Sequence, residues 1–257
     1  MKPVISVITV VNNSAATIAD TLLSVASQAY PHVEHIIIDG ASTDGTLKII
    51  HEHASHIAVI KSEPDRGMYD AMNKGLAMAT GDIIGFLNAD DVYADSHVLE
   101  NIASVIATQD MDACYGDLVY VDKSDIRKVV RYWQSQLYRD GLFEKGWMPA
   151  HPTFFVKRQV YEKYGGFDLD YKRQSDFELA MRFLAVHKIK SVYIPRVLVK
   201  MRSGGASSRV THIVAGNIEA YLACRKHALN VSPLFILRKI LSRIPQIFFR
   251  KKMQRQA

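Results

Sequence analysis

The chain has 257 residues, of which 48% are hydrophobic and 23% charged, an ordinary composition for one large domain or one domain with a small appendage. Its formal net charge is +6, but the segment from Ala220 onward holds nine Lys or Arg residues and no acid, so the first 219 residues carry −3. The basic charge therefore belongs to a C-terminal tail, and the body of the protein is not expected to bind nucleic acid.

Strands and helices are expected to alternate in the first half of the chain. Apolar, β-branched runs predict buried strands, and apolar residues at helical spacing predict the helices between them. The strands are expected at 4–11, 32–40, 57–63 and 82–91, and the helices within 12–28, 42–55 and 67–81. This order predicts an α/β fold, a single Rossmann-like domain with a mostly parallel central sheet and helices on both faces.

The second half of the chain is less regular. Two strands that pair are expected first. They are followed, in order, by a short strand, two helices, a further strand and a last helix. The paired strands are expected at 112–122 and 127–133, the short strand and first helix within 148–168, the second helix within 174–188, the further strand at 191–202 and the last helix at 212–229.

The two cysteines, Cys114 and Cys224, lie far apart in sequence and form no CxxC motif, which favours free thiols in a reducing cytosol. The N-terminal apolar run is interpreted as a buried strand and not as a signal peptide. No apolar stretch approaches the roughly 20 residues that a membrane-spanning helix needs. The protein is therefore expected in the cytosol.

The four predicted strands of the first half end in polar residues. Their ends read "NN" at 12–13, "DG" at 39–40, "EPDR" at 63–66 and "NADD" at 88–91. Ligands of parallel α/β sheets bind at the carboxyl ends of the strands. Since clustered carboxylates repel one another unless a cation lies between them, we expect a metal ion, Arg66 or both at this edge.

Asp39 ends the second strand in "IIIDGASTDGT". Its carboxylate can face an N–H group of a ligand, such as the imide of a nucleobase. The alternative is an ordinary strand-to-helix turn, in which Gly40 permits a tight exit and Ser42 and Asp44 cap the next helix.

Asp90 and Asp91 follow an apolar run in "FLNADDVY". Few carboxylates together with a substrate diphosphate are the arrangement in which Mg²⁺ is usually bound, and Mn²⁺ also suits oxygen ligands. The alternative is a helix N-terminus, where two acids interact favourably with the helix dipole.

The segments "SVITVVNN", "DGASTDGT", "SEPDRGMYDAMNKG" and "NADD" occur in this order. The set resembles family 2 glycosyltransferases of the GT-A fold, of the type that builds bacterial surface polysaccharides. The resemblance is close over residues 6–95 and looser over 149–207, and it is specific for the family but not for the sugar. It implies an inverting, metal-dependent transfer of one sugar from a nucleotide-diphosphate sugar to a hydroxyl of a glycan or polyprenyl-linked oligosaccharide.

The resemblance also implies a donor-side set of residues and Mg²⁺ or Mn²⁺ as the cofactor, with Asp90 as the metal ligand. Arg66 would pair with phosphate oxygens or with an acid of the site, for which its planar guanidinium is suited. Lys74 either joins this site or lies on a solvated helix face. The nucleotide-sugar-binding residues implied are Val10, Val11, Asn12, Asp39, Asp65, Arg66, Asn88, Ala89, Asp90 and Asp91.

Two departures from the family pattern affect the donor side. Asn88 stands where the metal motif usually has its first acid, which leaves the site one charge short. Asn12 stands where a tyrosine is common, which removes an aromatic side chain near the base.

The resemblance assigns the general base to Asp176, in "RQSDFELAMRF", because a carboxylate can take the proton of the acceptor hydroxyl. The alternative is a helix N-cap. Glu178, two residues on, points elsewhere on a helix. The acceptor-side candidates are His151, Glu178 and Arg202, although a lone histidine is as often structural.

No linker precedes Ser232-Pro233, so residues 1–230 are expected to form the GT-A domain, with a nucleotide-binding half (1–95) and an acceptor half (96–230). Residues 231–257 are expected to form a basic amphipathic tail. It either packs on the body or lies on an anionic membrane surface, which would place the enzyme on the cytoplasmic face of the inner membrane.

Two other functions stay open. A catalytically inactive module that binds nucleotide or glycan is favoured by Asn88 and opposed by the four acids Asp39, Asp90, Asp91 and Asp176. A nucleotidyltransferase would need a Gly-rich, basic loop after the first strand, and "VNNSAATIAD" has neither feature. A Rossmann dehydrogenase is disfavoured because no GxGxxG follows a strand.

Overall fold

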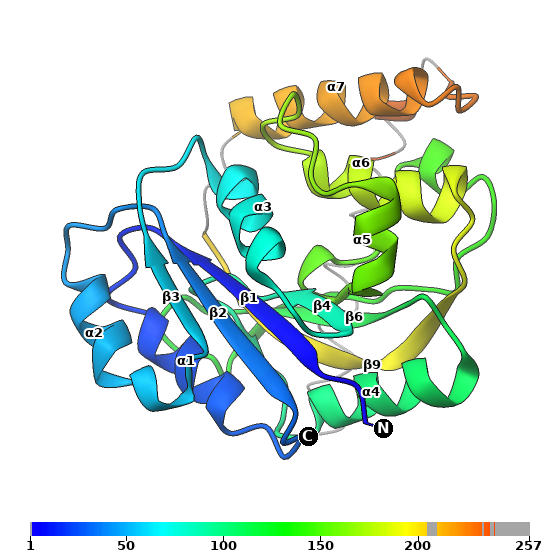
Figure 1. Cartoon of the computed structure of the whole chain (residues 1–257). Coiled ribbons are helices and arrows are strands. Elements are labelled where there is room, and N and C mark those ends of the chain that lie inside the picture. Colours follow the sequence, from blue (N-terminus) through cyan, green and yellow to red (C-terminus); the bar gives the residue numbers. More distant parts are fainter. Residues whose placement is uncertain (1, 205–209, 233, 237–238, 240–257) are drawn as a thin grey trace.

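The computed structural model describes residues 2–204, 210–232, 234–236 and 239. These residues form one curled nine-stranded sheet with helices on both faces (Figure 1). The strand order is β3-β2-β1-β4-β8-β6-β9-β5, and β7 pairs with β6 outside this path. The predicted α/β architecture is confirmed.

The first half of the sheet is parallel, as predicted. β1 (Ile5–Val11) pairs in parallel with β2 (Val33–Asp39) and with β4 (Ile83–Phe86), and β2 pairs in parallel with β3 (Val59–Ser62). Val11 lies opposite Asp39, and Asp39 lies opposite Ser62. The carboxyl ends of β1, β2 and β3 therefore lie level at one edge of the sheet.

The second half of the sheet is mixed, so the mostly parallel arrangement is limited to the first half. β8 (Phe155–Lys157) is antiparallel to β4 and to β6 (Ala113–Val121), and β7 (Val129–Trp133) is antiparallel to β6. β9 (Ser191–Arg202) is parallel to β6 and antiparallel to the short β5 (Val92–Tyr93). The sequence predicted that the strand at 112–122 pairs with the one at 127–133, and the pairing of β6 with β7 confirms this.

The helices cover both faces of the sheet because each buries one apolar side against it. On one face lie α1 (Ile18–Ala26), α2 (Thr46–Glu52) and α4 (Val98–Gln109), and on the other lie α3 (Met68–Met78), α5 (Arg158–Tyr164) and α6 (Ser175–Met181) (Figure 1). α6 continues into a π-helical turn, Arg182–Val186, and α7 (Val210–Lys226) packs on α6. Short 3₁₀ turns are formed by Ala54–His56, Phe143–Lys145 and His151–Thr153.

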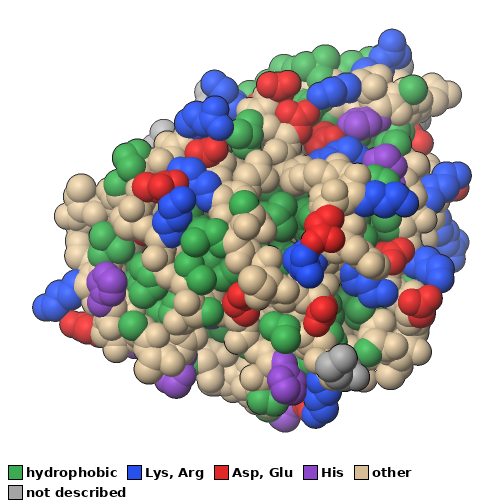
Figure 2. All heavy atoms as spheres, in the orientation of Figure 1, with side chains coloured by type: hydrophobic (Ala, Val, Ile, Leu, Met, Phe, Trp, Pro, Cys, Tyr) green, Lys and Arg blue, Asp and Glu red, His purple; other side chains and the backbone are tan. Residues whose placement is uncertain are grey.

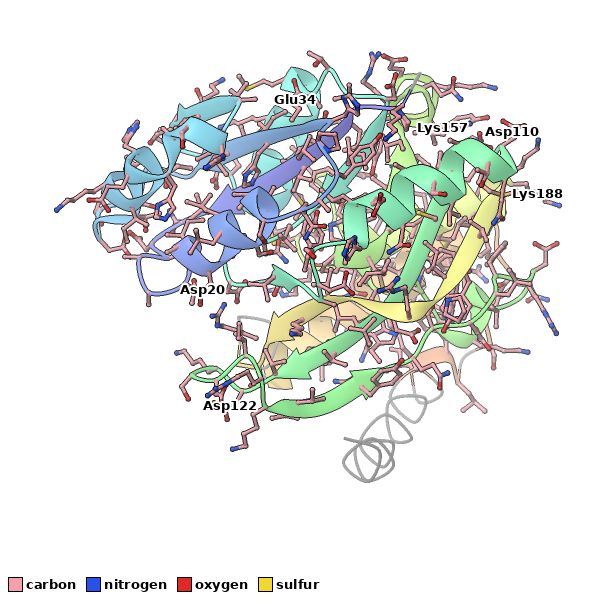
Figure 3. The ribbon with its side chains drawn as sticks, turned by 90° about the horizontal axis from the view of Figure 1, so that it is seen from below. Asp20, Glu34, Asp110, Asp122, Lys157 and Lys188 are labelled. Atoms are coloured by element: carbon pink, nitrogen blue, oxygen red, sulfur yellow. The ribbon has the colours of Figure 1, made fainter. Side chains whose placement is uncertain are left out.

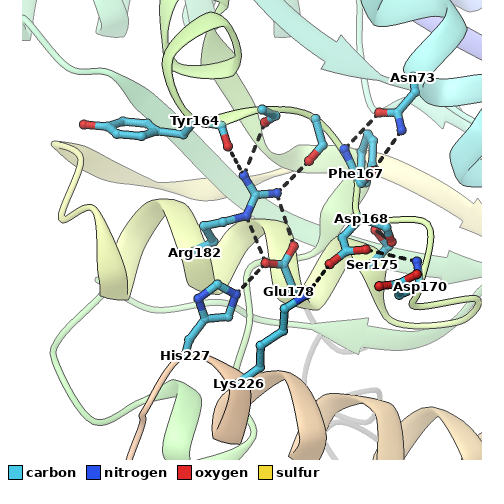
Figure 4. Close-up of polar contacts among 12 residues, drawn as sticks. Asn73, Tyr164, Phe167, Asp168, Asp170, Ser175, Glu178, Arg182, Lys226 and His227 are labelled. Carbon is cyan, nitrogen blue, oxygen red and sulfur yellow. Dashed lines mark hydrogen bonds and ion pairs between the residues drawn. The ribbon is translucent and has the colours of Figure 1, made fainter.

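A buried ion cluster fixes the junction of α5, α6 and α7 (Figure 4). The Glu178 carboxylate accepts hydrogen bonds from Arg182 at 2.9 and 3.2 Å and contacts His227 Nε2 at 2.7 Å. The Arg182 guanidinium also donates to the carbonyl oxygens of Tyr164 and, at 2.6 Å, Gly166, which end α5. Glu178 is thus occupied by two cationic or basic partners and serves the packing of the helices.

The expected division at residue 95 stays a prediction, as does the role of the tail. Of the tail, only residues 231, 232, 234–236 and 239 are described, and the predicted amphipathic segment otherwise lies outside the described residues. No described helix is long and apolar enough to cross a membrane. Cys114 and Cys224 are buried free thiols, as expected.

Candidate functional site

The ends of β1 and β2 and the turn after β3 meet at the level edge of the sheet. Asn12, directly after β1, donates from Nδ2 to the carbonyl oxygen of Gly40 at 2.7 Å. A Cβ atom at Gly40 would clash with Asp65 Oδ2 and would lie 3.2 Å from Asn12 Nδ2. The glycine therefore allows Asn12, Asp39 and Asp65 to converge, which the sequence predicted from the strand ends.

Asp39 is fully buried and only half satisfied. Its Oδ2 accepts hydrogen bonds from the Ser42 backbone N–H at 3.0 Å and from the Ser62 hydroxyl at 2.6 Å. Its Oδ1 is buried and has no hydrogen-bond partner among the described residues. A buried carboxylate oxygen without a donor is costly, so this atom is suited to a donor supplied by a ligand.

The segment from Asn88 to Asp91 also contains buried oxygens without hydrogen-bond partners among the described residues. Asp91 is fully buried, and its Oδ2 accepts from Asn88 Nδ2 at 3.1 Å. Oδ1 of Asn88 and Oδ1 of Asp91 are both buried without a partner in the part of the chain that the structure describes. Burial, and then the neighbouring Asp90, raise the pKa of Asp91 well above its usual range. Burial also raises the pKa of Asp90, against the opposing charge of Arg202.

Arg202 lies at this edge too, at the end of β9. Its guanidinium donates to the backbone carbonyl oxygen of Asp90 at 2.8 Å and pairs with Asp20 of α1, which is labelled in Figure 3. Its Nε is buried and, within the described residues, has no acceptor. The structure therefore brings Arg202 to the donor-side residue Asp90, although the sequence placed it among the acceptor-side candidates.

The charged turn between β3 and α3 pairs largely with itself. Arg66 contacts Asp70 twice, through its guanidinium and its backbone N–H, each at 3.0 Å. Lys74 reaches Glu63 at 3.0 Å and the Pro64 carbonyl oxygen at 2.8 Å. Lys74 thus holds the turn onto α3 and, at 22% exposure, does not lie on a solvated face, while its part in the site stays a prediction. The Arg66 side chain is 79% exposed and stays accessible to a ligand.

On the acceptor side, Asp176 lies in the first turn of α6. Its Oδ1 accepts a hydrogen bond from the Tyr69 hydroxyl at 2.9 Å. Tyr69 was not predicted from the sequence, although it lies within "GMYDAMNKG", because a contact across 107 positions leaves no local pattern.

His151 stands near Asp176, in the turn before β8. Its ring stacks on Phe86 with centroids 5.6 Å apart and meets Phe167 edge to face. Burial lowers the pKa of His151, against the opposing charge of Asp176. Its Nε2 is buried with no partner among the described residues, so the ring is neutral and packed while one nitrogen stays available.

The strand-end residues fit a divalent cation that a substrate also helps to bind. The described residues contain no group of three or more His, Cys, Asp and Glu side chains that could hold a metal by themselves. Mg²⁺ is commonly bound by one or two carboxylates together with substrate phosphates. Asp90, beside the unpartnered oxygens of Asn88 and Asp91, fits such a shared site.

A separate cavity of about 470 Å³ lies away from this edge. Its walls include Pro3, Asp82 and Arg158, and it contains none of the predicted site residues. Because Pro3 and Asp82 precede β1 and β4, this cavity is at the opposite ends of the strands, and we assign it no part in the site.

Comparison with solved structures shows the fold. TarS 1–349 of S. aureus, solved in complex with UDP-GlcNAc, is 17% identical with a TM-score of 0.66, covering 96% of this chain and 72% of that one. The mannosyltransferase PcManGT of Pyrobaculum calidifontis, solved with GDP-Man and Mn²⁺, is 20% identical with a TM-score of 0.66, covering 100% of this chain and 76% of that one. The predicted GT-A fold is confirmed.

Comparison of sequences shows the family. The PGL/p-HBAD biosynthesis glycosyltransferase of Mycobacterium bovis is 29% identical over 213 residues, which are 81% of this chain and 80% of that protein. The model of the family described as Glycosyl transferase family 2 matches residues 6–165, which run from the second residue of β1 to beyond β8 and include Asp39 and Asn88 to Asp91. The chain therefore belongs to glycosyltransferase family 2, as its sequence motifs predicted.

Proposed function

We propose that this glycosyltransferase transfers one sugar, with inversion, from a nucleotide-diphosphate sugar to a hydroxyl of a glycan or a polyprenyl-linked oligosaccharide. The observation that carries the proposal is the set of buried polar atoms at the strand ends that have no partner among the described residues: Asp39 Oδ1, Asn88 Oδ1, Asp91 Oδ1 and Arg202 Nε. A donor nucleotide and a cation would supply the missing partners. TarS was solved with UDP-GlcNAc and PcManGT with GDP-Man and Mn²⁺, which supports a donor of this class.

Each strand-end residue has a part in this proposal. Asp39 would accept a hydrogen bond from the base, near Val10, Val11, Asn12 and Asp65. Asp90 would hold Mg²⁺ or Mn²⁺ beside Asn88, Ala89 and Asp91, and the ion would neutralise charge on the leaving diphosphate. Arg66 is exposed and would exchange Asp70 for a phosphate oxygen, because surface ion pairs contribute little free energy.

Asp176 is proposed as the general base. It would accept the proton of the acceptor hydroxyl as that oxygen attacks the anomeric carbon. His151, with one nitrogen unpartnered, lies close enough to Asp176 to contact the acceptor. Glu178 is left out of the site because Arg182 and His227 already occupy its carboxylate.

A screen of donors tests the proposal. UDP-, GDP- and dTDP-sugars, each with and without Mn²⁺, should include one that raises the melting temperature only with Mn²⁺ and is then slowly hydrolysed. Binding without metal-dependent hydrolysis would indicate the inactive module that Asn88 favours. No stabilisation by any donor would contradict the proposed site.

We also propose that the enzyme binds an anionic membrane surface peripherally, on the cytoplasmic side. α7 exposes a stripe of aliphatic side chains one turn apart, Val214, Ile218 and Leu222, at 51%, 45% and 53% exposure. Figure 2 shows hydrophobic side chains along the edge that α7 forms in Figure 1. The acid-free basic segment follows directly, and such a combination suits a lipid interface.

Liposome sedimentation tests the membrane proposal. The full-length protein should pellet with anionic but not neutral vesicles, and truncation after Asn230 or serine at the three stripe positions should reduce pelleting. Equal pelleting of all variants, or no dependence on anionic lipid, would contradict it.

A further inference from the structure

A hydrogen bond between α3 and α6 joins the donor side of the domain to the acceptor side. Tyr69, in the first turn of α3, donates from its hydroxyl to Asp176 Oδ1 in the first turn of α6, at 2.9 Å. The Tyr69 ring is 5% exposed and stacks on Phe167 with centroids 5.5 Å apart. The buried ring stacked on Phe167 therefore holds the hydroxyl in place, and the hydroxyl points at the carboxylate.

Tyr69 can act on Asp176 only as a donor. Burial and the charge of Asp176 raise the pKa of Tyr69 well above its usual value, so the hydroxyl keeps its proton at any working pH. The other titratable group facing Asp176 is His151, which is packed against Phe86 and Phe167. Among the described residues, Asp176 Oδ2 has no side-chain hydrogen-bond donor.

A general base must be held in one geometry to be effective. A misplacement of about 1 Å at the reacting atoms can lower a rate on the order of 100-fold. An aspartate side chain rotates about two bonds. Asp176 Oδ1 accepts hydrogen bonds from the Tyr69 hydroxyl and from the Phe177 backbone N–H, both at 2.9 Å, and together they restrict these rotations. With Oδ1 bonded to Tyr69, Oδ2 is the oxygen left to receive the acceptor proton.

We propose that Tyr69 is a positioning residue, which fixes the Asp176 carboxylate so that Oδ2 faces the acceptor hydroxyl. The inference rests on the proposed role of Asp176 as the general base. In this proposal α3 serves both the donor side and the base, because the turn that carries Asp65 and Arg66 leads directly into the helix that carries Tyr69. The donor-side turn and the orientation of the base are thus set by one segment.

The first test uses Tyr69→Phe, which removes the hydroxyl and keeps the stacked ring. The matched control is Tyr161→Phe, a buried tyrosine that contacts Phe86 in the same aromatic cluster. In crystals of Tyr69→Phe the Asp176 side chain should leave its single rotamer, whereas Tyr161→Phe should keep it. A single, unchanged Asp176 rotamer in Tyr69→Phe would overturn the proposal without any assay of activity.

The second test uses hydrolysis of UDP-GlcNAc and GDP-Man, or of whichever donor the screen selects, with Mn²⁺. Tyr69→Phe should lower kcat on the order of 10-fold and leave the donor KM within about twofold, because the donor contacts are kept. A lower melting temperature with unchanged kcat would show a purely structural hydrogen bond and overturn the proposal.

A double-mutant cycle separates this inference from the proposed function. If Asp176→Asn keeps its activity, the general-base assignment itself is wrong. If Asp176→Asn is impaired and Tyr69→Phe adds no further loss to it, Tyr69 acts through Asp176 as proposed. An equal further loss in the Asp176→Asn background would show that Tyr69 acts independently and would overturn the positioning role.

Discussion

Two groups of buried acids in this molecule differ in whether their oxygens have partners. Glu178, at the junction of α5, α6 and α7, is bonded to Arg182 and His227, and the neighbouring, only partly buried Asp168 pairs with Lys226 (Figure 4). Asp39 and Asp91, at the ends of β2 and β4, each keep one buried oxygen without a donor among the described residues. The first group finds all its partners within the protein, whereas the second keeps oxygens for the nucleotide and cation that we propose.

The contrast has a direct energetic meaning. A buried carboxylate that is paired and hydrogen-bonded holds elements together, whereas one without a partner lowers stability by about 1–3 kcal/mol. The acids at the helix junction stabilise the fold, whereas those at the strand ends lower the stability of the free protein, where we propose that a ligand supplies the missing partners.

The largest effect is expected for Asp90→Ala. Loss of the ligand that would hold the metal should remove metal-dependent nucleotide binding and lower kcat/KM by roughly 1000-fold or more, because charge on the leaving diphosphate is no longer neutralised. Steady-state kinetics and thermal shift with Mn²⁺ measure both. The control is Asp122→Ala in the β6–β7 turn (Figure 3), which should behave as wild type. Near wild-type activity of Asp90→Ala would refute the metal assignment.

The next largest effect is expected for Asp176→Asn. If Asp176 is the base, turnover should fall by roughly 100-fold while donor affinity is kept, because the amide cannot accept the acceptor proton. Single-turnover rates and donor titrations separate the two quantities. A joint loss of donor affinity and melting temperature would instead place Asp176 with the stabilising acids.

Glu178→Gln probes the other group. Burial alone would raise the pKa of Glu178, but the bonds from His227 and Arg182 outweigh it and lower the pKa, so the group is charged in the fold. Loss of the charge should lower the free energy of unfolding by about 3 kcal/mol, because Arg182 is left without its counter-charge. Nucleotide binding by the folded protein should not change.

Urea unfolding measures this effect, and Glu100→Gln is the control. Glu100 makes an exposed pair with His97, so its change should alter stability by less than about 1 kcal/mol. If Glu178→Gln kept full stability but lost donor binding, the separation of the two groups of acids would fail.

The smallest effect is expected for Asp39→Asn. The variant keeps an oxygen for the Ser42 and Ser62 donors but offers an amide where the base would donate. Affinity for the nucleoside diphosphate should fall about 10-fold, with the same dependence on Mn²⁺. Isothermal titration with and without Mn²⁺ measures both. Unchanged affinity would remove Asp39 from the base-binding role.

The strand ends were predictable from the sequence because each acid ends a strand or follows one within a few residues. In parallel strands, residues that end neighbouring strands come together whatever the loops do, so Asn12, Asp39 and Asp65 could be grouped from local patterns alone. The parallel half of the sheet and the family followed from the same patterns.

Contacts that depend on the relative placement of distant elements were not predictable. Tyr69 meets Asp176 across 107 positions, and Arg202 meets Asp90 across 112. The mixed half of the sheet and the contact of Glu178 with His227, directly after α7, are of the same kind. Such contacts follow from packing of whole elements, which leaves no signal in a short stretch of sequence.

The central claim is that a nucleotide and a metal ion bind at the strand ends. Its most direct test is a crystal structure with Mn²⁺ and whichever of UDP, GDP or dTDP gives the largest Mn²⁺-dependent stabilisation. The account predicts an anomalous Mn²⁺ peak within bonding distance of the Asp90 carboxylate, diphosphate oxygens on the same ion, and a base N–H donated to Asp39 Oδ1. An Mn²⁺ peak elsewhere, or a nucleotide that leaves the buried oxygens of Asp39, Asn88 and Asp91 without partners, would contradict it.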